Sequence, residues 1–172
     1  MRFLLCFPLL FTGAVLFAQS PVFPDDWTGN WKGELHWYKA GQAALQKVPM
    51  ELRIQKTDSA AWTWHLIYGT PREDSRPYIL KPVDRSKGHW VVDEKNGILL
   101  DQFWVGNCLT GAFTVSGSTI LNTYRMENKE LVIDFFSLAA KPLATTGKGD
   151  EEIPFVDSYR VTGKQTARLL RQ

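Results

Sequence analysis

Residues 29–37, with the sequence Gly-Asn-Trp-Lys-Gly-Glu-Leu-His-Trp, alternate between two kinds of side chain. Trp31, Gly33, Leu35 and Trp37 fall on one face of an extended chain, and polar side chains fall on the other. A period of two is typical of a β-strand with one face in a core and one in water. The two glycines flanking Trp31 leave room for a large ring and for a closely approaching strand. The segment therefore predicts the first strand of a barrel, with Trp31 closing its floor.

Nine further segments show the same alternation or a short apolar run between turn residues. They are residues 48–55, 61–68, 78–83, 89–92, 98–105, 109–115, 120–126, 131–138 and 155–161. Helical patterns are nearly missing, and residues 166–170 predict only a frayed helical end. Residues 141–152 show no period and predict a long flexible loop. Because an open sheet of this size would expose aggregation-prone edges, we predict an all-β fold, a single closed antiparallel β-barrel of about ten strands.

The N-terminal residues have the composition of a targeting signal. Arg2 supplies a positive charge, residues 3–17 are almost wholly apolar, and Ala18 precedes a plausible cleavage site. The apolar run is short for a membrane span and is not continued beyond it. We therefore expect a secretory signal peptide over residues 1–18, cleaved near Ala18, and one domain over residues 19–172 without a transmembrane segment. A Pro-rich lead-in, residues 21–26, is expected against the barrel mouth or free of it.

Charge and cysteine content narrow the class of protein. The formal net charge is +2 at pH 7, so no long-range field attracts nucleic acid or an anionic membrane. Cys6 lies in the predicted signal peptide, which leaves Cys108 as the single cysteine of residues 19–172. No intramolecular disulfide can form there, and this scarcity favours a secreted or periplasmic protein of a bacterial envelope. The sequence predicts neither the oligomeric state nor a role for Cys108.

The opening strand also carries a family resemblance. Gly29-Asn30-Trp31, followed by Gly33, resembles the Gly-x-Trp opening of the calycin superfamily, which includes lipocalins, fatty-acid-binding proteins and nitrobindin-like barrels. With about ten strands, the chain looks closest to the nitrobindin-like or fatty-acid-binding arrangement. The resemblance implies a calycin-like barrel around a small ligand. It also implies an arginine packed over Trp31, and Arg160 and Arg168 are the candidates.

The ligand-specific features of these families are not matched. Nitrobindin-like proteins hold haem iron with a histidine late in the chain, whereas the last histidine here is His89. Fatty-acid-binding proteins grip a carboxylate with an Arg-x-Tyr pair near the end, whereas Tyr159 and Arg160 are adjacent and point to opposite faces of a strand. Residues 39–46 are too short for the two helices of that family. No cofactor is predicted, and haem is disfavoured.

Residues that catalysis or metal binding would need are scattered. His36, His65 and His89 show no metal-ligand spacing. The uncharged setting of Cys108 favours a buried, inert thiol over a reactive one. Asp101 and Asp134 are candidates for a paired acid and base, but nothing in the sequence brings them into one pocket. No catalytic residue and no metal ligand is therefore predicted.

Aromatic side chains are the richest feature, with seven tryptophans in the chain. Trp31 is expected to fill the core, whereas rings near the open end are expected to line a pocket, because their polar groups suit a site that is partly wet. Arg125 is a candidate partner for an anionic head group. The predicted ligand-binding residues are Trp37, Trp64, Tyr68, Tyr78, Trp90, Trp104 and Arg125.

These patterns favour a secreted or periplasmic binding protein that holds a small apolar or amphipathic molecule inside the barrel. One alternative is an envelope interaction or structural module with a filled barrel, which contacts another protein through its outer face or the 141–152 loop. The other is a barrel enzyme, a lyase, isomerase or hydrolase acting on an apolar substrate. The sequence favours binding over catalysis because it shows aromatic alternation without a catalytic constellation.

Overall fold

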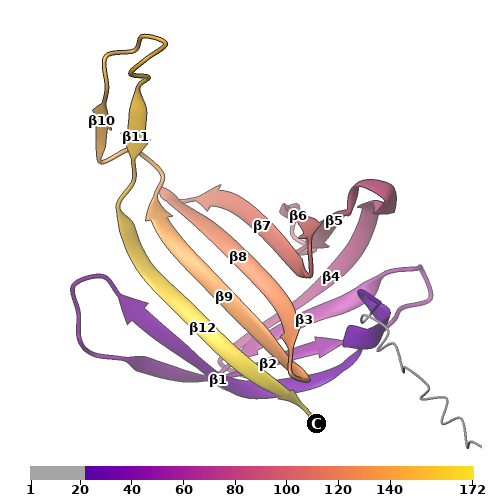
Figure 1. Ribbon diagram of the computed structural model, residues 1–172. Helices are drawn as coiled ribbons and strands as arrows, with labels where there is room; N and C mark the ends of the chain where they lie inside the picture. Colours follow the sequence, from indigo (N-terminus) through magenta and orange to yellow (C-terminus); the bar gives the residue numbers. More distant parts are fainter. Residues whose placement is uncertain (1–21) are drawn as a thin grey trace, which may run out of the picture.

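The computed structural model describes residues 22–172, and the predicted signal peptide lies outside this range. Ten antiparallel strands form one closed barrel in the order β1-β12-β9-β8-β7-β6-β5-β4-β3-β2 (Figure 1). The predicted all-β fold, a closed antiparallel barrel of about ten strands, is confirmed. From β1 to β9, each strand pairs with the next strand in the sequence. The closing strand β12 pairs with both β1 and β9.

The strands are short to medium in length, with one single-turn 3-10 helix before the first strand and another between β4 and β5. The helices are η1 (Asp25–Trp27) and η2 (Arg85–Lys87). The barrel strands are β1 (Gly29–Lys39), β2 (Gln46–Ile54), β3 (Trp62–Tyr68), β4 (Asp74–Asp84), β5 (His89–Asp93), β6 (Leu99–Val105), β7 (Cys108–Val115), β8 (Ser118–Glu127), β9 (Glu130–Ala139) and β12 (Val161–Arg171). Strands β10 (Ala144–Thr146) and β11 (Val156–Ser158) form a separate two-stranded sheet.

The prediction of the closing strand was wrong. Residues 155–161 do not close the barrel; β11 lies within them and pairs with β10, while β12 closes the barrel and includes the residues predicted as a helical end. The inward positions of β12 include Gly163, Gln165 and Ala167, which are small or polar. The sequence therefore lacks the apolar alternation that marks the other strands. Its partners β1 and β9, rather than its own pattern, hold it extended.

The segment predicted as a long loop contributes to a projecting hairpin. β10 lies within residues 141–152 and pairs with β11, which follows them, and the hairpin stands away from the rim where β9 ends and β12 begins (Figure 1). It exposes several apolar side chains, among them Leu143 and Phe155. The barrel core therefore contributes little to holding this hairpin.

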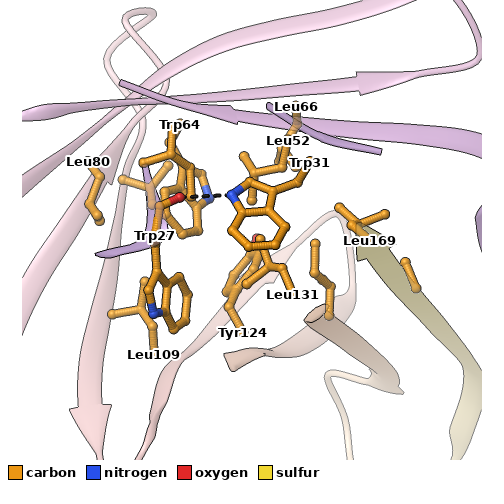
Figure 2. Close-up of a cluster of buried hydrophobic side chains, with 14 of the residues drawn as sticks. Trp27, Trp31, Leu52, Trp64, Leu66, Leu80, Leu109, Tyr124, Leu131 and Leu169 are labelled. Carbon is orange, nitrogen blue, oxygen red and sulfur yellow. Dashed lines mark hydrogen bonds between the residues drawn. The ribbon is translucent and has the colours of Figure 1, made fainter. Parts of the chain in front are cut away.

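The opposite end of the barrel is closed by tryptophans. Trp31 is 1% exposed, and its indole Nε1 donates a hydrogen bond to the carbonyl oxygen of Trp27 at 2.8 Å (Figure 2). Trp27 is fully buried and packs on Trp64, with ring centroids 6.5 Å apart. The expected closure of the floor by Trp31 is confirmed, with Trp27 as a second ring that the alternation of β1 does not include.

The lead-in and the arginine above the motif tryptophan differ from expectation. The described part of the lead-in packs at the closed end, where Phe23 stacks on Trp104 with centroids 4.7 Å apart. Arg171, rather than Arg160 or Arg168, places its guanidinium 4.6 Å from the Trp31 ring centroid. The register explains this, because Arg171 lies directly opposite Trp31 across the β1–β12 ladder. The sequence alone does not give that register.

Candidate functional site

The lumen is packed at the closed end and hollow toward the open end, and the inward side chains of β9 and β12 become smaller in that direction. On β9 the inward residue changes from Leu131 at the closed end to Ser137 at the open end. On β12 it changes from Leu169 to Gly163. On these two strands leucines near the floor thus give way to small or polar residues near the mouth, and the lumen contains two adjoining chambers.

The outer chamber opens at the mouth and has a volume of about 380 Å³. This volume lies within the range of known small-molecule sites, roughly 300–1,000 Å³. Most of its wall is apolar, and polar groups are contributed by Tyr68, Arg76, Ser137 and Gln165. The apolar wall consists of Leu35, Trp37, Val48, Phe113, Ile120 and Phe135.

The inner chamber is smaller and more polar, with a volume of about 80 Å³. It shares four wall residues with the outer chamber, namely Tyr68, Arg76, Phe113 and Phe135, which therefore form the neck between the two. The Gln102 and Asn122 amides also line it. A molecule in the outer chamber can extend only a small group through this neck.

Arg76 is the only cation among the described residues that line the two chambers, and its charge is already matched. Its Nε and Nη2 donate hydrogen bonds to the two carboxylate oxygens of Asp74 at 2.9 and 2.7 Å. The guanidinium also lies 4.8 Å from the ring centroid of Tyr68. The hydrogen bond with Asp74 raises the pKa of Arg76, so the guanidinium stays charged at the neck.

The phenols around the neck are neutral at ordinary pH. Burial raises the pKa of Tyr68 to about 12. Burial, and then the nearby Glu94 carboxylate, raise the pKa of Tyr78. Glu94 is the single carboxylate among the described residues lining the chambers. With Arg76 matched by Asp74, the lumen holds no excess positive charge.

The structure divides the predicted ligand-binding residues into three groups. Trp37 and Tyr68 line the outer chamber, and Trp64, Tyr78 and again Tyr68 line the inner one. Their part in ligand binding stays a prediction, but alternation placed them correctly at a hollow.

Trp90 and Trp104 lie elsewhere. They border a separate hollow of about 230 Å³ at the closed end, together with Phe23 and Arg85. The Arg85 guanidinium lies 5.3 Å from the Trp90 ring centroid. The expectation that all these rings meet in one hollow is therefore wrong for Trp90 and Trp104, because they lie at the floor end of their strands.

Arg125 points outward, contrary to its predicted role. Its Nη1 donates to Asp134 Oδ2 at 2.8 Å, and Lys164 Nζ lies 3.6 Å from Asp134 Oδ1. Tyr124, the neighbour of Arg125 on β8, takes the inward position and lines the inner chamber. Adjacent residues on a strand face opposite ways, so Arg125 belongs to an ion pair on the outer wall.

This ion pair gives a pH-dependent prediction. Burial raises the pKa of the Asp134 carboxyl, but the hydrogen bonds from Arg125 and Thr166 and the nearby charge of Lys164 outweigh it and lower the pKa overall. The pair therefore stabilises the fold above the unfolded pKa of about 3.9, and this contribution is lost as the pH falls through the folded value. Asp134→Asn should lower the free energy of unfolding at pH 7 by about 1–3 kcal/mol. Urea unfolding at pH 7 and pH 3 should show the difference from wild type shrinking in acid.

The matched control for this prediction is Asp101→Asn. Asp101 Oδ1 accepts a hydrogen bond from His89 Nε2 at 2.7 Å on the exposed surface. Exposed pairs contribute about 0–1 kcal/mol, so this variant should change stability little. An equal loss in the two variants at pH 7 would contradict the assignment of the Asp134 pair.

The other candidate residues are dispersed over the outer wall. His36 bonds to Glu34, His65 to Ser75, and none of the three histidines lines a chamber. Cys108 is partly exposed, not buried as expected, since it lies at the β6–β7 turn. Among residues 22–172 no group of three or more His, Cys, Asp or Glu side chains is placed to hold a metal ion.

Several residues of the chambers were missed by sequence reasoning. The strand predicted over residues 78–83 begins after Pro77 and excludes Arg76, whereas β4 runs through Pro77 and pairs it with His65. Extending the alternation from Leu80 and Tyr78 by two more residues would have found Arg76. Gln102 and Asn122 gave no such signal, since only the closure of the barrel brings them together.

Comparisons with known proteins assign no family to the chain. No protein-family model matches the sequence, and a search of curated proteins finds no match. Within residues 22–172, the helices are too short and polar to cross a membrane. The function must therefore be argued from the two chambers.

Proposed function

We propose that the barrel binds a small, largely apolar and uncharged molecule in its outer chamber. The observation that carries the proposal is a hollow of about 380 Å³ at the open end with a mainly apolar wall. An apolar ligand that leaves water for this wall gains roughly 25 cal/mol for each Å² buried. The polar groups at the neck and rim then orient it.

The charge of the lumen argues for a neutral ligand. Arg76 already has a bidentate carboxylate partner in Asp74, and Glu94 adds a negative charge in the inner chamber. A ligand anion that enters must either displace Asp74 or lie near carboxylates without a free cation. Both cost electrostatic free energy in a partly desolvated site.

We also propose that the protein is a calycin-like barrel that acts outside the cytoplasm. The calycin-like assignment is supported by the Gly-x-Trp opening of β1 and by Arg171 packed over Trp31. A location outside the cytoplasm is supported by the N-terminal composition and by the single cysteine, Cys108, of the predicted mature chain.

A panel of matched ligands tests the proposal. Alkylbenzenes, phenylalkanols and phenylalkanoates of equal chain length should be titrated into the protein by calorimetry. The two neutral series should bind, and the carboxylates should bind at least about ten-fold more weakly, the factor that 1.4 kcal/mol represents. Binding of none of the series, or tightest binding of the carboxylates, would overturn the proposal.

A cavity-filling variant tests the location of the site. Ser137→Trp places a large ring into the outer chamber from β9, and it should raise the dissociation constant of the neutral ligands at least about ten-fold while leaving the melting temperature nearly unchanged. Phe136→Trp is the control, since Phe136 is the exposed neighbour on the same strand. Equal effects of the two variants would place the ligand elsewhere.

The projecting hairpin favours an interaction role as a second candidate function. Leu143, Phe155 and Val156 are 61%, 67% and 52% exposed. Exposed apolar clusters of this kind mark contact surfaces in many proteins. Sedimentation of the full chain and of the double variant Leu143→Ser/Phe155→Ser tests this role. A monomer in both cases would exclude self-association through the hairpin.

An enzyme that acts in the lumen would have few acid–base groups available. Glu94 is the only carboxylate lining the chambers within the described chain. The phenol nearest to it, Tyr78, has a raised pKa and is therefore neutral at pH 7, so it is a poor base. Asp101 and Asp134, the pair considered from sequence, lie on the outer wall, where Asp101 contacts His89 and Asp134 forms an ion pair with Arg125.

A further inference from the structure

The inner chamber contains a buried pair of amides. Gln102 on β6 and Asn122 on β8 are 1% and 2% exposed, and Asn122 Nδ2 donates to Gln102 Oε1 at 2.8 Å. The other amide atom of Asn122, Oδ1, is buried and has no protein partner. Burying a polar atom without a hydrogen bond costs roughly 1–3 kcal/mol, so such atoms usually meet a ligand or water.

The chain is shaped to hold this amide pair. Gly111 lies on β7 between the two, and a Cβ built there would lie 2.2 Å from Gln102 Nε2. Any other residue would push the Gln102 amide out of its position. The β6–β7 ladder also ends at Phe103 and Thr110, so Gln102 and Gly111 occupy the place where the two strands part. The polar pair is therefore accommodated by the backbone around it.

A donor without a partner lies in the same wall. The indole Nε1 of Trp64 is buried and forms no hydrogen bond of good geometry, although the Tyr124 hydroxyl lies near it, and Trp64 lines the inner chamber with Asn122. An unpaired indole alone does not mark a site, since Trp27 Nε1 is also unpaired and lines neither chamber. In the inner chamber, however, Trp64 carries an unpaired donor and Asn122 an unpaired acceptor, and both residues line one space of about 80 Å³.

We propose that the inner chamber binds a hydroxyl group carried by the ligand, an inference that rests on the proposed function of the outer chamber. The hydroxyl donates to Asn122 Oδ1 and accepts from Trp64 Nε1–H, which satisfies both unpaired atoms. A hydroxyl also fits the reversed orientation of the Asn122 amide, because it can then accept from Nδ2. The chamber has room for a group of about the size of a water molecule or two, which takes up ~30 Å³ each.

This assignment defines the ligand class. The apolar body fills the outer chamber, the neck excludes a second ring, and a short arm carries the hydroxyl inward. A carboxylate in the same place would face Glu94, and a methyl group would leave both buried polar atoms unpaired. A site that hydrogen-bonds a hydroxyl rejects the analogue that lacks it more strongly than an apolar wall rejects an extra methylene.

The inference is tested by comparing the binding of two ligand series. The first consists of phenylalkanols with two, three and four methylene groups, and the second of alkylbenzenes with the same numbers of heavy atoms. With the wild type, the best-fitting alcohol should bind at least about ten-fold more tightly than its hydrocarbon match. In the double variant Gln102→Leu/Asn122→Leu this ratio should fall to about one, with hydrocarbon binding retained. Replacing both amides by apolar groups of similar size leaves no amide unpaired, so the fold is expected to persist, as a thermal melt will show.

The outcomes separate this inference from the function on which it rests. The proposed hydroxyl site is wrong if the dissociation constants of hydrocarbons and alcohols are nearly equal in the wild type, or if their ratio is unchanged in the double variant. The proposed function of the outer chamber is retained in both cases. If neither series binds, both proposals fall. A second readout is the indole N–H resonance of Trp64, assigned with Trp64→Phe. It should shift with the alcohol and stay in place with the hydrocarbon.

Discussion

Replacing Trp31 with alanine is expected to lower the free energy of unfolding by about 3–5 kcal/mol, the range for removing a large ring from a core. Trp31 is 1% exposed and is in contact with Trp27, just before β1, and with Arg171, at the end of β12. Its indole N–H is bonded to the carbonyl of Trp27, and the guanidinium of Arg171 covers its ring. The substitution therefore removes apolar burial, a buried hydrogen bond and a cation–π contact together. Since domains are stable by only about 5–15 kcal/mol, much of the fold's stability is at risk.

Chemical denaturation of three variants measures this effect. Trp31→Ala should show the full loss, and Trp31→Phe a smaller one, because phenylalanine keeps a ring but leaves the Trp27 carbonyl unpaired. Trp37→Ala is the matched control, because Trp37 lies on the same strand and face at the open end, where its side chain borders the outer chamber. A loss in Trp37→Ala as large as in Trp31→Ala would contradict a floor that is packed and a mouth that is hollow.

The contrast between Trp31 and Trp37 also shows what the sequence could predict. Alternation in β1 and β3 identified inward residues correctly, including Trp31, Trp64 and Tyr68. It could not tell how far along the lumen each residue lies, because height depends on strand register and on the tilt of closed strands. Trp90 and Trp104 were assigned to the ligand pocket for this reason, and they belong to the floor.

Strand register also explains why the sequence did not predict Arg171 over Trp31, the Gln102–Asn122 pair or β12. Arg171 meets Trp31, and Gln102 meets Asn122, only when the barrel has closed. No local pattern encodes such pairs, and a one-residue shift of a strand would exchange its faces. β12 was missed for a related reason, since its inward residues are too small or polar to reveal a strand, and its two neighbours determine its path. The fold class followed from local patterns, whereas the polar parts of the site did not.

The close approach of β1 and β12 gives the second large prediction. A Cβ added at Gly33 would lie 2.2 Å from the carbonyl oxygen of Arg168 and 2.9 Å from Leu169 Cδ2. The oxygen belongs to the backbone, so no rotamer change relieves the contact, and β12 itself must move away from β1. This ladder closes the barrel, and Gly33 lies opposite Leu169 within it. Gly33→Ala should therefore lower the free energy of unfolding by about 3 kcal/mol, at the upper end of the usual cost of overpacking.

Gly163→Ala provides a graded comparison in the same ladder, because its added Cβ would lie 2.9 Å from the carbonyl oxygen of Tyr38. A smaller shift relieves that contact, and we expect a loss of about 1 kcal/mol. Urea unfolding measures both losses, and hydrogen exchange shows where they act. In Gly33→Ala the amides of β1 and β12 should lose protection ahead of those of β3 and β4, because the strain lies in the closing ladder. Uniform loss across the barrel, or a larger loss in Gly163→Ala, would mean that the first and last strands do not approach most closely at Gly33.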